Sequence, residues 1–167
     1  MPHRSSNPQQ QFQAVEDLLT RWLKERRSLL GRYTEIAVAL DSVMEGQGGN
    51  TSLGTRQKAL CEVLVDYISA GHFEVFNELL SEAESFADGS SELAARLMPA
   101  IGDTTEVILA YEEKYGSGAN YPDTLKRDLS SLGELLESRF VLEDQLIAGL
   151  HNRHRRLVET QAPGGTT

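Results

Sequence analysis

The sequence contains very little cysteine and no long apolar run, and each absence excludes a class of protein. The single cysteine, Cys61, rules out a framework of intramolecular disulfides. None of the 167 residues belongs to a run of roughly eighteen apolar residues, the length that a membrane-spanning helix needs. The polar first residues contain no apolar segment of the kind found in secretory signals. We therefore expect a cytoplasmic protein that does not associate with a membrane.

Sequence signatures of common enzymes and metal sites are also missing. The chain has no Gly-x-Ser-x-Gly, no His-Glu-x-x-His, no Gly-rich phosphate loop after a strand, and no Glu-x-x-His pair of the di-iron bundles. His151, Arg153, His154, Arg155 and Arg156 are cations near the end of a predicted helix, where free carbonyls and the helix dipole favour them. The sequence thus predicts no catalytic residue, no bound metal and no cofactor.

The charge balance is acidic, with a formal net charge of -9 at pH 7. Direct binding to nucleic acid requires basic groups against phosphates, so this balance argues against it. An acidic protein instead attracts basic partners through long-range electrostatic steering. We expect any macromolecular partner to be a protein with a basic surface.

Apolar residues recur at helical spacing in four long segments that are separated by Gly-containing loops. The pattern is typical of amphipathic helices, with no strand-like alternation and no internal repeat. The predicted helices cover residues 12–44, 53–87, 93–115 and 122–150.

Four such helices with short connections indicate an all-α, antiparallel, up-down-up-down four-helix bundle. We assign the bundle to residues 12–157, a disordered arm to residues 1–11 and a disordered tail to residues 158–167. Pro99 interrupts the third helical pattern, so this helix is expected to be kinked or broken there. Pro122 suits the first turn of the fourth helix.

Several polar residues fall on the apolar stripes of the predicted helices, which indicates a polar network inside the bundle. Arg26 lies at the centre of the first stripe and therefore needs an internal partner. Arg139 and Glu143 lie four residues apart within about 20° of the centre of the fourth stripe. The predicted network comprises Arg26, His72, Arg139 and Glu143, with Tyr33 and Tyr67 close enough to join it.

This network has two interpretations. It can be a satisfied structural network, in which Glu143 neutralises an arginine and His72 donates a hydrogen bond. It can also be a pocket for a small ligand or a metal, like those built between the facing helices of other bundles.

The second predicted helix carries another surface, at roughly 80 to 160° from its apolar stripe. This strip contains Asp66, Ser69, Phe73 and Asn77, followed by Leu80. A large aromatic side chain among acidic residues suggests a contact surface for a partner. Alternatively, Phe73 and Leu80 widen the buried face of a helix that packs between two neighbours.

Three stretches carry a distinctive pattern: Leu64-Val-Asp-Tyr-Ile-Ser-Ala-Gly-His-Phe-Glu-Val-Phe76, Leu136-Glu-Ser-Arg-Phe-Val-Leu-Glu-Asp-Gln-Leu-Ile147 and Asp17-Leu-Leu-Thr-Arg-Trp-Leu-Lys-Glu-Arg26. In these stretches the chain closely resembles the Rsd/AlgQ family of bacterial anti-sigma factors. The resemblance is spread over three of the four predicted helices, whereas the loops and both ends match only loosely.

The resemblance implies a cytoplasmic helical regulator that binds the C-terminal, promoter-reading domain of the primary sigma factor. Such a regulator keeps sigma from core RNA polymerase and promoter DNA in stationary phase, and members in enteric bacteria also bind the phosphocarrier protein HPr. It further implies that Asp66, Ser69 and Phe73 contact sigma, and the helical projection adds Asn77 to the same strip. The alternative function is ligand or metal binding through His72, Arg139 and Glu143.

Overall fold

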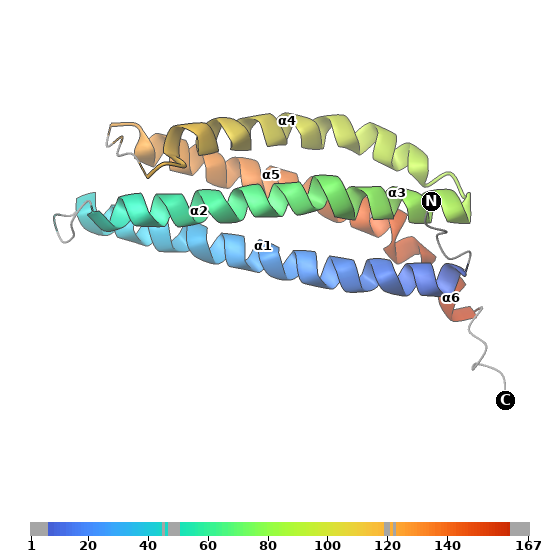
Figure 1. Ribbon diagram of the computed structural model, residues 1–167. Coiled ribbons are helices and arrows are strands. Elements are labelled where there is room, and N and C mark those ends of the chain that lie inside the picture. Colours follow the sequence, from blue (N-terminus) through green and yellow to red (C-terminus); the bar gives the residue numbers. More distant parts are fainter. Residues whose placement is uncertain (1–6, 45, 47–50, 119–120, 122, 161–167) are drawn as a thin grey trace.

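The computed structural model describes residues 7–44, 46, 51–118, 121 and 123–160, and these residues form helices joined by short connections (Figure 1). The elements in chain order are α1 (Pro8–Met44), α2 (Thr51–Ala70), the π-helical turn η1 (Gly71–Val75), α3 (Phe76–Phe86), α4 (Ser91–Tyr115), α5 (Leu125–Leu150), the 3-10 turn η2 (Asn152–His154) and α6 (Arg155–Thr160). No strand occurs in the described ranges.

The helices are arranged as four long rods of alternating direction, because α2, η1 and α3 follow one another as a single rod (Figure 1). α1 packs along α2, α2 packs along α4, and α4 packs along α5. The predicted all-α, antiparallel four-helix bundle is therefore confirmed. Within the described residues, no helix combines the length and the apolar character that crossing a membrane requires.

The first helix begins at Pro8, earlier than the expected start at Phe12, because the chain supplies a helix cap there. The side-chain oxygen of Asn7 accepts hydrogen bonds from the backbone N–H groups of Gln9 and Gln10, at 2.9 and 3.4 Å. Pro8 then occupies the first helical position, where its missing N–H costs nothing. Part of the expected arm is thus helical, while residues 1–6 lie outside the described residues.

Two further expectations concern prolines and the end of the chain. α4 runs through Pro99 without a break, and because Pro99 and Ala95 are exposed, the carbonyl that loses its helical donor can bond to water. Pro122 lies outside the described residues, and α5 begins at Leu125. Residues 158–160 belong to α6 rather than to a tail, and residues 161–167 are not described.

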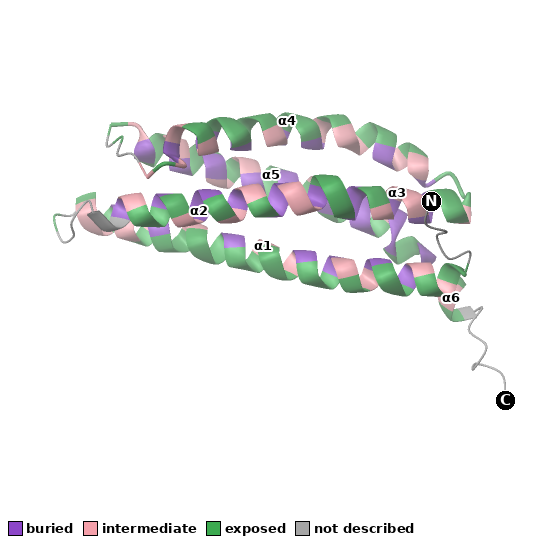
Figure 2. Ribbon diagram, in the orientation of Figure 1, coloured by how far each residue is buried: buried purple, intermediate pink, exposed green. Residues whose placement is uncertain are grey.

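The core of the bundle is built from the inward stripes of all four rods, which Figure 2 shows as purple bands that face one another. Trp22, Leu29 and Ile36 are the buried anchors of α1, and the single cysteine is also buried. Burial raises the pKa of the Cys61 thiol to about 12, so this group behaves as a small apolar residue.

The second rod keeps its buried face through a single wide turn. Its buried residues follow α-helical spacing up to Gly71 and again from Val75 onward, and the turn between these two residues is wound as a π-helix. In η1 the Phe76 N–H donates to the Gly71 carbonyl, five residues back, as in a π-turn. One extra residue is thereby absorbed without turning α3 away from the core.

Candidate functional site

The predicted strip on the second rod lies on its solvent side. Asp66, Phe73 and Asn77 are exposed and Ser69 is partly exposed, although these residues come from α2, η1 and α3 in turn. The side chain of Phe73 is 71% exposed, which is unusual for so large an apolar group. Phe73 therefore does not widen the buried face of the helix, whereas the neighbouring Leu80 packs against the core.

Carboxylates surround this strip on both sides. Glu25 of α1 and Glu74 of η1 line a shallow hollow between those two elements. Glu62 and Asp66 of α2 line another hollow, together with Glu112 of α4. An exposed aromatic ring is thus flanked by negative charge, which suits a basic protein surface that also carries an apolar pocket.

The pKa of the Glu25 carboxyl is affected by the acidic residues around it. Loss of hydration at the protein surface raises its pKa above the ordinary value, and the negative charges of Asp66 and Glu74 raise it further, while Arg21 acts in the opposite direction. A cation brought to this surface would relieve that repulsion.

His72 does not lie in the core, contrary to the prediction from the sequence. Its side chain is exposed, and its ring packs edge-on against the Phe73 ring with the centroids 4.8 Å apart. The prediction drew the buried stripe through Val65, which is only partly buried, whereas Leu64 and Tyr67 are fully buried. The next position on this face is Gly71, four residues after Tyr67, and His72 falls beside it. The predicted grouping of His72 with Arg139 and Glu143 therefore does not occur.

The remaining members of the predicted network do meet at the centre of the bundle, around the buried carboxylate of Glu143. Arg139 donates to it from one turn earlier in α5 at 2.9 Å, and Arg26 of α1 donates at 3.0 Å. The hydroxyl of Tyr67 of α2 donates to the same oxygen as Arg26, and burial raises the pKa of this hydroxyl so that it remains a donor. The internal partner expected for Arg26 is Glu143, with a second bond to Asp144 at 2.8 Å.

The network also reaches the remaining helix. The buried guanidinium of Arg139 donates to the hydroxyls of Thr104 and Thr105 in α4, at 2.9 and 2.7 Å. Tyr33 does not join it, because its hydroxyl donates to the Leu129 carbonyl on α5 at 2.9 Å. The Glu143 network thus links all four rods through satisfied hydrogen bonds and fits a structural role.

A second buried polar cluster, which the sequence did not reveal, closes the C-terminal end of the bundle. Both carboxylate oxygens of the buried Glu82 of α3 form hydrogen bonds, one with the Nδ1 of His151 and the other with the Nδ1 of His154, each at 2.7 Å. The Nε2 of His151 lies 2.7 Å from Glu16 of α1, and the Nε2 of His154 lies 3.0 Å from Asp88. We call these five residues the histidine cluster.

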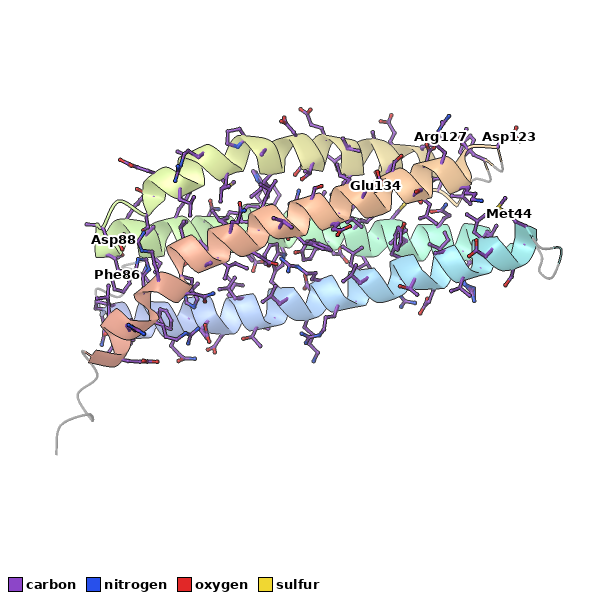
Figure 3. All side chains as sticks on the ribbon, turned by 180° about the vertical axis from the view of Figure 1, so that it is seen from behind. Met44, Phe86, Asp88, Asp123, Arg127 and Glu134 are labelled. Carbon is purple, nitrogen blue, oxygen red and sulfur yellow. The ribbon has the colours of Figure 1, made fainter. Side chains whose placement is uncertain are left out.

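The surroundings of the histidine cluster reinforce it. His151 stacks on Phe12 and His154 stacks on Phe86, with centroids 4.1 and 4.0 Å apart. Arg155 bonds to Glu16 at 3.1 Å, and Figure 3 shows Phe86 and Asp88 at the end of the bundle where the chain turns into α6. The cluster fastens η2 and α6 to α1 and α3.

The histidine cluster corrects the interpretation of His151 and His154, which are buried against carboxylates rather than placed beside the free carbonyls of a helix end. Each imidazole has a carboxylate oxygen within hydrogen-bonding distance of both ring nitrogens. Two ligands of a tetrahedral metal ion with bonds of about 2.0 to 2.2 Å lie about 3.3 to 3.6 Å apart, so a nitrogen and an oxygen 2.7 Å apart are placed for a hydrogen bond instead. Across the described residues, no group of histidine, cysteine and acidic side chains could hold a metal ion.

Comparison with known proteins identifies relatives over most of the chain. The family described as "Regulator of RNA polymerase sigma(70) subunit, Rsd/AlgQ" matches residues 1–151. The Regulator of sigma D of Yersinia enterocolitica is 31% identical over 153 residues, which cover 88% of this chain and 88% of that protein. The Regulator of sigma D of Shigella dysenteriae is 34% identical over 154 residues, covering 88% and 92%. No solved structure matches the chain.

Replacing Arg139 by methionine should lower the free energy of unfolding by about 3 to 5 kcal/mol, because it removes one partner of a fully buried ion pair. Urea unfolding at pH 7, followed by circular dichroism, measures the change. Arg32→Met is the matched control, since Arg32 forms an exposed ion pair with Glu35 that should contribute about 0 to 1 kcal/mol. Equal losses in the two variants would contradict the assigned role of the Glu143 network.

The histidine cluster should make stability fall in acid. Partial burial alone would raise the pKa of Asp88, but hydrogen bonds from Ser90 and His154 outweigh it and lower the pKa to about 2, from an ordinary 3.8. A depressed pKa in the folded state stabilises the fold above roughly pH 4, and this contribution disappears as the pH falls toward 2. Thermal unfolding between about pH 2 and 5 should therefore show a shallower decline for Asp88→Asn than for the wild type. Asp103→Asn, an exposed control on α4, should follow the wild-type profile.

Proposed function

The chain belongs to the Rsd/AlgQ family of regulators of the RNA polymerase sigma(70) subunit, and on that premise we propose that it is an anti-sigma factor for the primary sigma factor. We propose that it binds the C-terminal promoter-reading domain of sigma in the cytoplasm, where RNA polymerase works. Sigma held in this way is kept from core polymerase and from promoter DNA, which favours alternative sigma factors in stationary phase.

The observation that carries this proposal is the exposed ring of Phe73 within an acidic surface. A domain that reads promoter DNA presents arginine and lysine side chains toward phosphates. Asp66 can accept a charge-assisted hydrogen bond from such a side chain, and Phe73 can fill an apolar pocket beside it. Ser69 and Asn77 would then add polar contacts along the same line.

The proposed mechanism is occlusion and requires no chemical step. An acidic protein seated on the basic surface of sigma covers the groups that would otherwise contact DNA phosphates. Attraction between opposite charges speeds the encounter, and dissolved salt screens it. Binding should therefore weaken as the ionic strength rises.

The polar core offers no comparable support for a ligand or metal site. Both oxygens of Glu143 already accept hydrogen bonds from Arg26, Tyr67 and Arg139, and the histidine once expected beside them is at the surface. The function that we assign to this network is to hold the four rods in register.

Replacing Asp66 or Phe73 by alanine should weaken binding to the isolated C-terminal sigma domain by about 1 to 3 kcal/mol, because each removes a central contact. Calorimetric titration of the purified protein, at a low and a high salt concentration, measures this change. Circular dichroism should show unchanged helix content, since both side chains are exposed. The phosphocarrier HPr, which the family resemblance also implies as a partner, is titrated in a separate series.

The controls for this experiment are Glu137→Ala and Val141→Ala on the outer side of α5. Glu137→Ala removes an exposed acidic group, as Asp66→Ala does. Val141→Ala truncates an exposed apolar side chain, as Phe73→Ala does, and Val141 is 53% exposed. Both controls should bind sigma like the wild type. Wild-type protein that is folded but does not bind the sigma domain would overturn the proposal, and undiminished binding by both test variants would remove its assigned surface.

A further inference from the structure

The π-turn η1 determines how the strip is presented. Ser69, Phe73 and Asn77 are spaced four residues apart. In an unbroken α-helix, side chains at this spacing differ in direction around the helix axis by about 40° from one to the next. The π-turn contains one extra residue, so each of its residues advances by roughly 80° instead of about 100°. Measured from the buried face, the three side chains then point in nearly the same direction, directly away from the core.

Without the extra residue, this alignment would be lost. If the same residues formed a regular α-helix, Asn77 would be turned by roughly 80° relative to Ser69. The residues that form one line would instead wind around the rod, and a rigid partner could not contact all of them at once. The register of the contact line therefore depends on the π-turn.

A buried side chain on the neighbouring helix holds this turn in place. Trp22 of α1 is 2% exposed, and its indole N–H donates to the backbone carbonyl of Tyr67, at 3.1 Å, in the turn before η1. A Cβ atom on Gly71 would lie 2.9 Å from the Cζ2 of Trp22, so only glycine permits this approach. Beyond the π-turn, the ring of Phe76 meets the indole edge-on at 5.7 Å.

The indole thus contacts the rod before, at and after its irregular turn. It also stacks on the ring of Tyr67 at 4.7 Å, and the hydroxyl of Tyr67 is fixed by Glu143 and Arg26. The position of the π-turn is therefore tied to the polar centre of the bundle through two aromatic side chains. Such irregular turns persist only where the surrounding structure supports them.

From this geometry we infer that Trp22 is a positioning residue for partner binding, and that the one-residue π-turn under it aligns Ser69, Phe73 and Asn77 into a single recognition line. The inference rests on the proposed function, because it specifies how that surface is built. The partner that fits the line is a rigid helical surface with an apolar pocket for Phe73 and a basic residue for Asp66. Trp22 itself would touch no partner.

Deleting His72 tests the alignment. Removal of one residue from the π-turn should produce a regular α-helix whose two halves still face the core, while Phe73 turns by roughly 60° out of the line. The Kd for the C-terminal sigma domain should rise at least about tenfold, which corresponds to about 1.4 kcal/mol. His72→Ala keeps the extra residue and lies off the line, so its Kd should stay within about twofold of the wild type.

The outcomes separate this inference from the proposed function. A wild-type protein that fails to bind sigma overturns both. Wild-type binding with an equally tight, folded His72 deletion overturns the inference alone. A deletion variant that cannot fold also overturns it, because the extra residue would then be a necessary part of the core. Amide NMR shifts of residues 69–77 report whether the turn has become a regular helix.

Replacing Trp22 by phenylalanine tests the positioning role separately. This change keeps an aromatic ring but removes the N–H that bonds to Tyr67, and we expect the Kd for the sigma domain to rise by roughly three- to tenfold. Ile36→Val is the control, because it weakens the core of α1 by about 0.5 to 1.5 kcal/mol at a site away from the π-turn. An unchanged Kd for folded Trp22→Phe, or an equal rise in both variants, would contradict the positioning role.

Discussion

The buried carboxylate of Glu143 is the constraint on which the interior of this bundle depends. A charge removed from water is costly unless hydrogen bonds and opposite charges surround it, and Glu143 obtains both from Arg139, Arg26 and Tyr67. Because these donors come from three helices, and Arg139 bonds onward to α4, the relative heights of all four rods are fixed. Apolar packing alone is less directional and would specify that register less tightly.

The same interactions extend from the centre of the bundle to its surface. Tyr67 takes part in the Glu143 network through its hydroxyl and supports Trp22 through its ring and its carbonyl. Trp22 in turn packs against the only π-turn among the described residues, and this turn carries Phe73. A polar core can thus support the proposed binding function, because it stabilises the geometry of the proposed recognition surface. In this bundle the π-turn η1 lies at the proposed contact with sigma, because it contains Phe73.

The ends of the bundle are held by different means. At the N-terminal end of α1, Asn7 caps the free amides, and the histidine cluster joins the last part of the chain to α1 and α3. Met44 and Asp123 mark the opposite end of the bundle (Figure 3). The proposed recognition line lies between these ends, on the middle of the second rod, where packing against α1 and α4 keeps the backbone in place.

The sequence by itself determined the fold class, because the 3.6-residue periodicity of apolar residues is a local property of each helix. It also identified Arg139 with Glu143 and the need of Arg26 for an internal partner, since charges at the centre of an apolar stripe must be compensated. Only the tertiary structure decided what depends on groups from separate helices. The π-turn that Trp22 supports is one such feature, and the burial of His151 and His154 beside carboxylates of α1 and α3 is another. Such contacts arise from the docking of distant segments, and no regular period along the chain encodes them.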